Sequence, residues 1–487
     1  MEVRTRIAPS PTGYPHLGTI YQAMFDFVFA KKTGGKFIVR IEDTDRSRFV
    51  EGAEKIIFDS LKWFGLIADE DPEKGGEFGP YRSSERLDLY KKYALQLIES
   101  KHAYYCFCTK ERLDEMRKDQ DAKHLPPMYD RHCRDLTEEE VKQKHDKNTS
   151  SVIRLKIPEN RTLTFHDSVV GDVDFDTNLV DDQVIMKSDG FPTYHLAVII
   201  DDTFMEITHV FRGMEWLPSV PKHILIYEFL GWIDKMPTFT HLPLILNNEG
   251  GGKLSKRHGH SSVDYYRKEG FLPEAVLNYL ANIVWNNPSG QEIFPLSEFE
   301  KAFELEPFKV SVKPQGAKFD LKKLEWVNGE WIRGMSDEEL TKRLQEYLVD
   351  HPAEGKIAHI VPLIKERIKK LSDFIPLTDF FWEEVEYEGE VFNRIISEKG
   401  KVKSLIEKIL EVIETMGKPW KKEEFEESFK KFGEDNNLSN TQTFQLIRIA
   451  ISGQTVTPPL FESIQILGEE KTIDRFKKAI HYLTSVS

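Results

Sequence analysis

The chain has 487 residues, 40% of them hydrophobic, 11% aromatic and 30% charged, which is the composition of a folded protein too long for a single core. Its net charge of -14 argues against a general nucleic-acid coat, but not against a nucleic-acid partner, because the local field at a binding face decides the contact. The N-terminal MEVRTRIAPSPTG lacks the apolar core of a signal peptide, and no apolar run approaches the roughly 18 residues that cross a bilayer. We therefore expect a cytoplasmic protein that does not contact membranes.

The first part of the chain predicts alternating strands and helices. VRTRIAPS reads as a strand that runs into a Pro-Gly turn, and apolar residues then recur at helical spacing from Leu17 to Lys32. FIVRI, residues 37–41, predicts a second strand, and AEKIIFDSLKWFG predicts a helix that ends at Gly65. A strand, a turn with glycine, a helix and a strand begin a doubly wound nucleotide-binding sheet.

Residues 101–190 interrupt this rhythm with a charged helix, KERLDEMRKDQ, and short strands such as SVIRLKI, so they predict an insertion. The α/β pattern resumes at FPTYHLAVIIDD, whose apolar run predicts a central parallel strand. A helix around SVPKHILIYEFLG and a strand at HLPLIL follow. Beyond about Lys318 almost every segment has helical period, which predicts an all-α C-terminal half.

The expected fold is therefore α/β: a doubly wound, Rossmann-like parallel-sheet domain with an inserted α+β domain, followed by an all-α C-terminal half. The expected boundaries are 1–100 and 188–262 for the halves of the sheet domain, 101–187 for the insertion, 263–320 for a first helical domain and 321–487 for a second.

The turn IAPSPTGYPHLGT places His16 and Gly18 where a helix begins. The N–H groups and positive dipole at that end of a helix favour phosphate, and Gly18 would let a base or phosphate approach the backbone closely. A histidine there can donate to a phosphate oxygen as charge shifts in a transition state. The alternative is an ordinary Pro/Gly turn with a helix cap.

Two charged stretches predict a site for an acidic substrate. RIEDTD places Glu42 at the end of a strand, where open α/β sheets bind ligands, and its carboxylate could pair with an ammonium group. HVFRGMEW places Arg212 after a strand, and Arg6 could supply a second guanidinium to hold carboxylates bidentately. Structural ion pairs are the alternative for all three residues.

GGGKLSKRHGH, residues 250–260, brings three glycines together with Lys253, Lys256 and Arg257. Glycine and charge both favour solvated turns, which is one reading of the stretch. The other is a mobile loop that closes over phosphate. The stretch alone does not decide between them.

Taken in order, IAPSPTG…PHLG, GGKFIVRIEDTDRSR, SDGFPTYHLA and KLSKRHG resemble bacterial-type glutamyl-tRNA synthetases, which are class I aminoacyl-tRNA synthetases. LEWVNGEWIR and SGQTVTPPLFESIQILG resemble the helical C-terminal half of that family, so the resemblance covers the whole chain. It implies ATP-dependent ligation of L-glutamate to the 3′ end of tRNA(Glu) through a glutamyl adenylate. It also implies Mg²⁺ with the ATP and a monomeric protein.

The resemblance also assigns residues, and it identifies KLSKR with the family's KMSKS loop over the ATP phosphates. Thr19 stands where the HIGH signature has its second histidine, Arg257 where KMSKS has serine, and Val198 where some relatives carry asparagine. The implied catalytic residues are His16, Gly18, Lys253, Lys256 and Arg257; those around glutamate are Arg6, Ala8, Ser10, Glu42, Tyr194, Arg212 and Trp216; those around ATP are His16, Gly18, Thr19, Glu215, Ile245, Lys253 and Lys256.

The three cysteines, Cys106, Cys108 and Cys133, lie within the predicted insertion, and their clustering suggests a metal more than a disulfide scaffold. Zinc takes four ligands. In the family the fourth ligand follows the last cysteine by two residues, which is Asp135 here, with His132 as the neighbouring alternative. We expect zinc; the other reading is three free thiols.

In the helical half, KERIKK, residues 365–370, predicts a basic helical stretch, for which a solvated surface is the ordinary reading. The resemblance implies that Arg367 contacts the anticodon of tRNA(Glu). Whether tRNA(Gln) is also charged stays open.

Other functions fit the sequence less well. A small-molecule nucleotidyltransferase would lack the KLSKR loop with its helical continuation, and a glutaminyl-tRNA synthetase would carry a β-barrel anticodon module. A non-enzymatic binding relative would be expected to lose PHLG or KLSKR, and both are intact.

Overall fold

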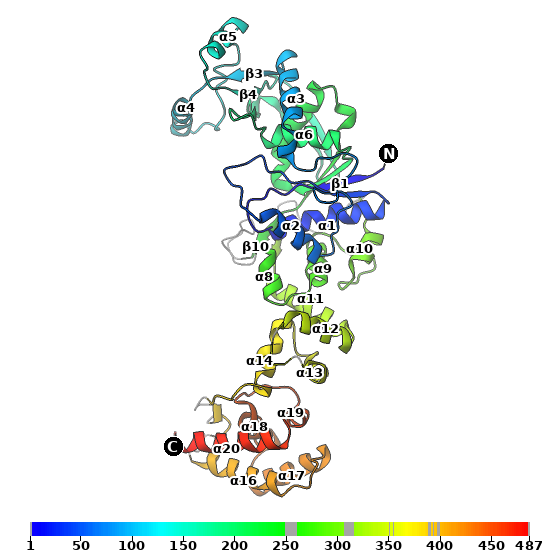
Figure 1. Cartoon of the computed structure of the whole chain (residues 1–487), viewed down its shortest axis with the longest axis vertical. Coiled ribbons are helices and arrows are strands. Elements are labelled where there is room, and N and C mark those ends of the chain that lie inside the picture. Colours follow the sequence, from blue (N-terminus) through cyan, green and yellow to red (C-terminus); the bar gives the residue numbers. More distant parts are fainter. Residues whose placement is uncertain are drawn as a thin grey trace. The chain divides into compact units, whose positions relative to one another are not determined.

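A computed structural model of the chain describes residues 2–248, 261–305, 316–349, 351–353, 355–387, 391–392, 394–396 and 400–485. The chain divides into two units: Met1–Arg267 with Pro273–Leu324, and Lys268–Leu272 with Glu325–Ser487. Strands occur in the first unit, whereas the regular elements described in the second are all helices (Figure 1). None of the helices described is long and apolar enough to cross a membrane.

A four-stranded parallel sheet in the order β2-β1-β8-β9 forms the centre of the first unit. Helix α1 connects β1 to β2 along the chain and packs against β1, β2 and β8, and most of its apolar residues are buried (Figure 1). Because β1 has β2 on one side and β8 on the other, the strand order reverses there, which is where open α/β sheets bind ligands. The elements are β1 (Arg4–Ile7), α1 (Leu17–Lys32), β2 (Lys36–Val39), α2 (Ala53–Trp63), β8 (His209–Gly213), α7 (Val220–Phe229) and β9 (Thr238–Leu242).

FPTYHLAVIIDD does not form the central strand that we predicted: Tyr194–Phe204 is a helix, α6. A continuous apolar run fits a fully buried helix as well as a parallel strand, and the length of 11 residues favours the helix. The helix is buried over most of its length, and the acids at its C-terminal end, Asp201 and Asp202, point into an ion-pair network.

The predicted strand HLPLIL is divided into two. Its first part completes β9, and after Pro243 the chain leaves the sheet, because proline cannot donate a hydrogen bond to a neighbouring strand. Ile245–Asn247 then forms β10, which pairs with β11 (Ala317–Phe319) in a separate two-stranded sheet.

The insertion is α+β, as predicted. A three-stranded antiparallel sheet in the order β3-β4-β7 lies beside a hairpin of β5 and β6, and two largely exposed charged helices flank it. Helix α3 (Leu87–Glu99) precedes the insertion. The elements of the insertion are β3 (Ala103–Cys106), α4 (Lys110–Ala122), α5 (Glu138–Asp146), β4 (Val152–Leu155), β5 (Thr162–Asp167), β6 (Gly171–Asp176) and β7 (Val184–Met186).

The remaining helices confirm the predicted all-α C-terminal half, with amphipathic helices such as α16 burying one apolar stripe. They are α8 (Val263–Lys268), α9 (Pro273–Val284), α10 (Leu296–Ala302), α11 (Leu321–Gly334), α12 (Asp337–Tyr347), α13 (Ile357–Ile364), α14 (Phe374–Thr378), α16 (Lys401–Thr415), α17 (Lys422–Asp435), α18 (Asn440–Ser452), α19 (Leu460–Leu467) and α20 (Glu469–Ser485).

The basic stretch KERIKK is not helical, contrary to the prediction: α13 ends at Ile364, and residues 365–370 form turns and bends. The Asp373 carboxylate accepts the backbone N–H groups of Lys369 and Lys370, at 2.8 and 3.0 Å. This side-chain acceptor offers the backbone an alternative to a longer helix.

Candidate active site

A cavity of about 820 Å³ opens at the carboxyl ends of β1, β2 and β8, beside the strand reversal. The strands supply Arg6 and Arg212, and the segments that follow β1 and β2 supply Ala8, Ser10 and Glu42. All seven residues that the sequence assigns to glutamate line this one cavity: Arg6, Ala8, Ser10, Glu42, Tyr194, Arg212 and Trp216.

Arg6 and Glu42, which line the cavity, belong to a buried network of ion pairs. Arg6 donates twice to the Asp202 carboxylate, at 3.1 Å each, and the fully buried Arg40 donates to Asp202 at 2.7 Å and to Glu42 at 3.1 Å. Such pairs offset the cost of burying charge only when their geometry is good. Burial raises the pKa of Glu42, against the lowering effect of Arg40 and Arg6. The network fixes Arg6 and Glu42 as one cation and one acid at the cavity wall.

Arg212 presents unused hydrogen-bonding capacity to the cavity. It is 3% exposed; Nε donates to His241 Nε2 at 2.9 Å and Nη1 approaches His223 Nδ1 at 3.3 Å. Its Nη2 is buried, and no described residue accepts a hydrogen bond from it. Since an unpartnered buried donor is costly, this nitrogen points to a carboxylate ligand.

Aromatic rings form the wall next to Arg212. Tyr194, the first residue of α6, lies with its ring centroid 4.4 Å from that of Trp216, and its hydroxyl is 3.5 Å from Arg212 Nη1. Trp216 belongs to a 3₁₀ turn over Met214–Ser219 that follows β8. A short aliphatic chain that ends in a carboxylate suits this combination of apolar rings and guanidinium.

His16 caps the N-terminus of α1. Its Nδ1 accepts the backbone N–H of Gly18 at 3.0 Å, so in the neutral ring the proton is on Nε2, which can donate to a phosphate oxygen. A Cβ at Gly18 would lie 3.3 Å from this ring nitrogen, so a larger residue would crowd it.

The predicted phosphate loop, residues 250–260, lies outside the described residues, and Lys253, Lys256 and Arg257 lie outside them with it. Where description resumes, Ser261 accepts the backbone N–H of Leu17 at 2.8 Å, and Ser262 forms a bridge with His16. The chain therefore returns from this loop directly to the N-terminus of α1.

The other predicted ATP contacts lie apart from the lining of the cavity. Thr19 is half-buried in α1, Glu215 is exposed on the turn after β8, and Ile245 is buried at the start of β10. The cavity lining includes none of these three.

The three cysteines meet in the insertion, with their sulfur atoms within 4.8 Å of one another. The hydroxyl of Tyr129 lies 3.3 Å from the Cys106 sulfur and 3.2 Å from that of Cys108. The structure does not bring the predicted fourth ligand, Asp135, into this group: it is exposed, as is His132. The donors that converge are therefore three thiols and a phenol, an S₃O set that fits a tetrahedral zinc.

In the second unit Arg367 lies in the turn after α13. Its Nη1 donates to the backbone oxygen of Thr457 at 2.7 Å, and Arg448 donates to the same oxygen at 3.1 Å. Burial and, secondarily, the charge of Arg367 lower the pKa of Arg448. Two guanidinium groups thus share one carbonyl, which leaves positive charge available for a further acceptor.

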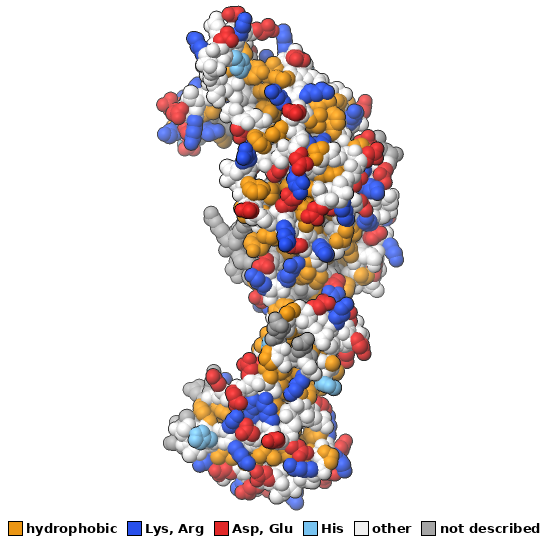
Figure 2. Space-filling model, in the orientation of Figure 1, with side chains coloured by type: hydrophobic (Ala, Val, Ile, Leu, Met, Phe, Trp, Pro, Cys, Tyr) orange, Lys and Arg blue, Asp and Glu red, His pale blue; other side chains and the backbone are white. Residues whose placement is uncertain are grey.

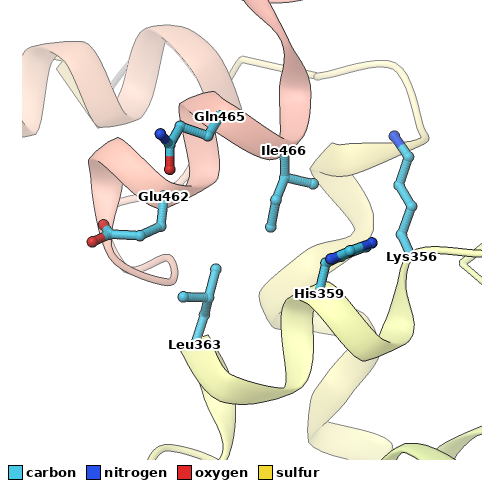
Figure 3. Close-up of a pocket in the computed structure, with 6 residues that line it drawn as sticks. All are labelled: Lys356, His359, Leu363, Glu462, Gln465 and Ile466. Atoms are coloured by element: carbon cyan, nitrogen blue, oxygen red, sulfur yellow. The ribbon is translucent and has the colours of Figure 1, made fainter. Parts of the chain in front are cut away.

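The second unit also contains a hollow of about 400 Å³ between α13 and α19 (Figure 3). No residue that the sequence assigned to a site lines it. Its lining residues are Lys356, His359, Leu363, Glu462, Gln465 and Ile466.

Two protein-family models match the chain. The model for the catalytic domain of class I tRNA synthetases (E and Q) matches residues 2–326. The chain belongs to this synthetase family. A model for an anticodon-binding domain matches residues 339–480, which is the helical region of the synthetase.

Named relatives span the whole synthetase. A glutamate–tRNA ligase of Treponema denticola is 40% identical over 99% of both chains, and one of Dehalococcoides mccartyi is 42% identical over 100% of this chain and 99% of its own. A crystal structure of a glutamate tRNA ligase from Elizabethkingia meningosepticum in complex with its amino acid superposes with a TM-score of 0.85. It is 37% identical and covers 99% of this chain and 100% of its own.

Several residues that contact the candidate sites were not predicted from the sequence. Arg40 and Asp202 lie in the stretches RIEDTD and IIDD, 162 positions apart, and only the folded chain shows that they pair. Tyr129 was not predicted as a ligand because tyrosine is not among the usual zinc ligands. His241 was read as part of an apolar strand.

Proposed function

We propose that the chain joins L-glutamate to the 3′ end of tRNA(Glu) in two steps. The α-carboxylate of glutamate attacks the α-phosphorus of ATP. A new P–O bond to the carboxylate forms, the P–O bond between the α-phosphorus and diphosphate breaks, and diphosphate leaves. A hydroxyl of the terminal ribose of the tRNA then attacks the carbonyl carbon of the adenylate, and AMP leaves. ATP enters with Mg²⁺, which carries part of the phosphate charge.

The buried Nη2 of Arg212 is the observation that carries the choice of substrate. We assign the side-chain carboxylate of glutamate to Arg212, with the apolar rings of Tyr194 and Trp216 along its methylene groups. Glu42 is assigned to the ammonium group and Arg6 to the carboxylate that reacts, since both line the same cavity. Glutamine would present an amide N–H₂ group to the donors of Arg212, which disfavours it.

Catalysis in this proposal rests on positioning and on stabilising charge, because the carboxylate of the substrate glutamate is itself the nucleophile. His16 donates from Nε2 to a phosphate oxygen, supported by the hydrogen bond that Gly18 makes to its Nδ1. We assign Lys253, Lys256 and Arg257 to the leaving diphosphate, and Gly18, Thr19, Glu215 and Ile245 to ATP.

We propose that zinc binds Cys106, Cys108, Cys133 and the Tyr129 phenolate and stabilises the insertion. The hydrogen bond from the Cys133 thiol lowers the pKa of Cys106, which favours the thiolate that a metal needs. The guanidinium of Arg154 lies 3.8 Å from the centre of the Tyr129 ring. Burial raises the pKa of the Tyr129 hydroxyl, so the phenol would lose its proton only as the metal binds.

We assign Arg367 to the anticodon of tRNA(Glu), supported by its place beside Arg448 within the region that matches an anticodon-binding domain. We further propose that the protein acts as a cytoplasmic monomer. Charging of both tRNA(Glu) and tRNA(Gln) is the second candidate activity.

The test is charging of labelled glutamate, with glutamine as the competing amino acid. We expect tRNA(Glu) to accept glutamate and not glutamine. Arg212→Ala should abolish charging at glutamate concentrations that saturate the wild type, while tRNA binding stays unchanged. Glutamine charging by the wild type would contradict the proposal.

A further inference from the structure

The guanidinium of Arg212 is part of a row of buried polar side chains that extends away from the cavity. His241 is 0% exposed, and Asp167 and His223 are 1% exposed. Such a network is expensive unless its members satisfy one another. In order, the row is Asp167, His241, Arg212, His223 and His195.

Asp167 anchors one end of the row. Its Oδ1 accepts the backbone N–H groups of Val169 and Val170, at 2.9 Å each, and its Oδ2 accepts the backbone N–H of His241 at 3.0 Å and the ring Nδ1 at 2.7 Å. Burial raises the pKa of Asp167, but the hydrogen bonds from His241 and the backbone outweigh it and leave the pKa below its ordinary value. The side chain is thus a carboxylate that accepts four hydrogen bonds.

The chemistry of the neighbours fixes the protons of His241. A carboxylate only accepts, so Nδ1 of His241 carries a proton; a guanidinium only donates, so Nε2 is bare and accepts from Arg212 Nε at 2.9 Å. His241 is therefore neutral and in a single tautomer. A second proton on its ring would face the Nε–H group of Arg212.

The same logic continues on the other side of Arg212. Nδ1 of His223 faces the donor Nη1 at 3.3 Å, so it is bare and the proton of His223 is on Nε2, directed at Nδ1 of His195 at 3.3 Å. Two of the nitrogens of Arg212 are thus held from outside the cavity, and Nη2 remains for the ligand.

The row connects two parts of the first unit. Asp167 is the last residue of β5 in the inserted segment, whereas His241 and Arg212 lie opposite each other in the paired strands β9 and β8. The inserted segment therefore contacts the arginine of the cavity through one imidazole ring.

We propose that Asp167 and His241 are positioning residues that hold the guanidinium of Arg212 in its binding orientation, so that the inserted segment sets the affinity for the amino acid. The proposal rests on the proposed function, in which Arg212 binds the glutamate side chain. Neither residue lines the cavity, so neither touches the substrate.

Two amide substitutions separate the two hydrogen bonds of His241. His241→Asn places an amide near the position of Nδ1, which keeps the donor to Asp167 and loses the acceptor for Arg212. His241→Gln places its amide near the position of Nε2, which can keep the acceptor for Arg212 and loses the bond to Asp167. Asp167→Asn removes the charged acceptor and allows the opposite tautomer, whose Nε2–H would face Arg212.

The experiment measures KM for glutamate and for ATP in charging of tRNA(Glu), with glutamate binding by calorimetry and the melting temperature of each variant. His241→Asn and Asp167→Asn should raise the glutamate KM about tenfold or more, the range of one charge-assisted hydrogen bond, while the ATP KM changes by less than about twofold. His241→Gln should restore most of the loss. Asp172→Asn is the matched control, because it breaks an exposed His–Asp pair of 2.6 Å in the same hairpin and should change neither KM.

Equal increases in the KM for glutamate and for ATP, or identical behaviour of His241→Asn and His241→Gln, would show a merely structural role and overturn the proposal. Failure of the proposed function is distinguishable, because the wild type would then neither charge tRNA(Glu) nor bind glutamate in calorimetry. If only the assignment of Arg212 to the substrate were wrong, Arg212→Lys would leave the glutamate KM unchanged. A glutamate KM that responds to Arg212→Lys but not to His241→Asn overturns the positioning role alone.

Discussion

Replacing Arg212 with lysine keeps the positive charge and removes the planar fork. The structure indicates what is lost: Nε, held by His241 at 2.9 Å, and Nη2, which we assign to the substrate. The guanidinium also lies 4.5 Å from the centre of the Phe239 ring, a contact that positions it in the cavity wall. An ammonium group on a flexible stem cannot reproduce these contacts together.

The expected cost follows from one or two charge-assisted hydrogen bonds, each worth about 1.5–3 kcal/mol, of which the retained charge recovers a part. Since about 1.4 kcal/mol corresponds to a factor of ten, the glutamate KM should rise by roughly 10- to 100-fold. The ATP KM should stay nearly constant, because Arg212 contacts the amino-acid side of the cavity.

The assay is initial-rate charging of tRNA(Glu) with glutamate varied at saturating ATP and tRNA, and then with ATP varied. Arg161→Lys is a matched control, because Arg161 forms a two-pronged pair with Glu228, 2.7 Å for each contact, at an exposed position. Surface pairs of this kind contribute about 0–1 kcal/mol, so neither KM should change. A glutamate KM within about threefold of the wild type in Arg212→Lys, or a parallel rise in the ATP KM, would refute the assignment.

Three further predictions concern the other assigned groups. Burial raises the pKa of Glu42, so its charged form is lost as the pH falls toward that raised value. The affinity for glutamate, measured by calorimetry from pH 8 down to pH 5, should therefore fall at the acidic end. Glu42→Gln should bind glutamate weakly and without this pH dependence. Elemental analysis should find one zinc per chain, and Tyr129→Phe should lower the affinity for zinc about 10- to 100-fold. If Tyr129→Phe bound zinc as tightly as the wild type while Asp135→Ala lost it, Asp135 would be the fourth ligand instead. Arg367→Ala should raise the KM for tRNA(Glu) about tenfold with an unchanged glutamate KM, and unchanged tRNA kinetics would exclude the anticodon contact.

The sequence predicted well those elements whose pattern is local. The helix over Leu17–Lys32 has the predicted bounds, because its apolar spacing and the following glycines determine both ends. Seven residues assigned to the substrate glutamate line one cavity. Six of them lie on or directly after strands of one parallel sheet, whose carboxyl ends meet at one edge; the seventh, Tyr194, begins helix α6.

The errors arose where the deciding partners are distant in the sequence. Tyr194–Phe204 is a buried helix whose apolar run also fits a buried strand, and its acid Asp202 pairs with Arg6 from a distant part of the sequence, which periodicity does not reveal. The contact between Asp167 and His241, 74 positions apart, depends on how the insertion folds back on the sheet. The contacts of Tyr129 with Cys106 and Cys108 depend on how the insertion itself folds. Figure 2 shows acidic and basic side chains intermingled on the viewed face. The net charge of the chain therefore did not indicate which partners it binds.

The central claim is that this chain charges tRNA(Glu) with glutamate. The most direct measurement incubates the protein with labelled glutamate, ATP and Mg²⁺, and with purified tRNA(Glu) or tRNA(Gln) in separate reactions. The account predicts acid-precipitable glutamate on tRNA(Glu), with one AMP and one diphosphate released for each glutamate transferred. Label on tRNA(Gln) as well would still show ligation of glutamate to tRNA, but it would exclude a role of Arg367 in selecting tRNA(Glu). Absence of label on both tRNAs, with folded protein, would contradict the account.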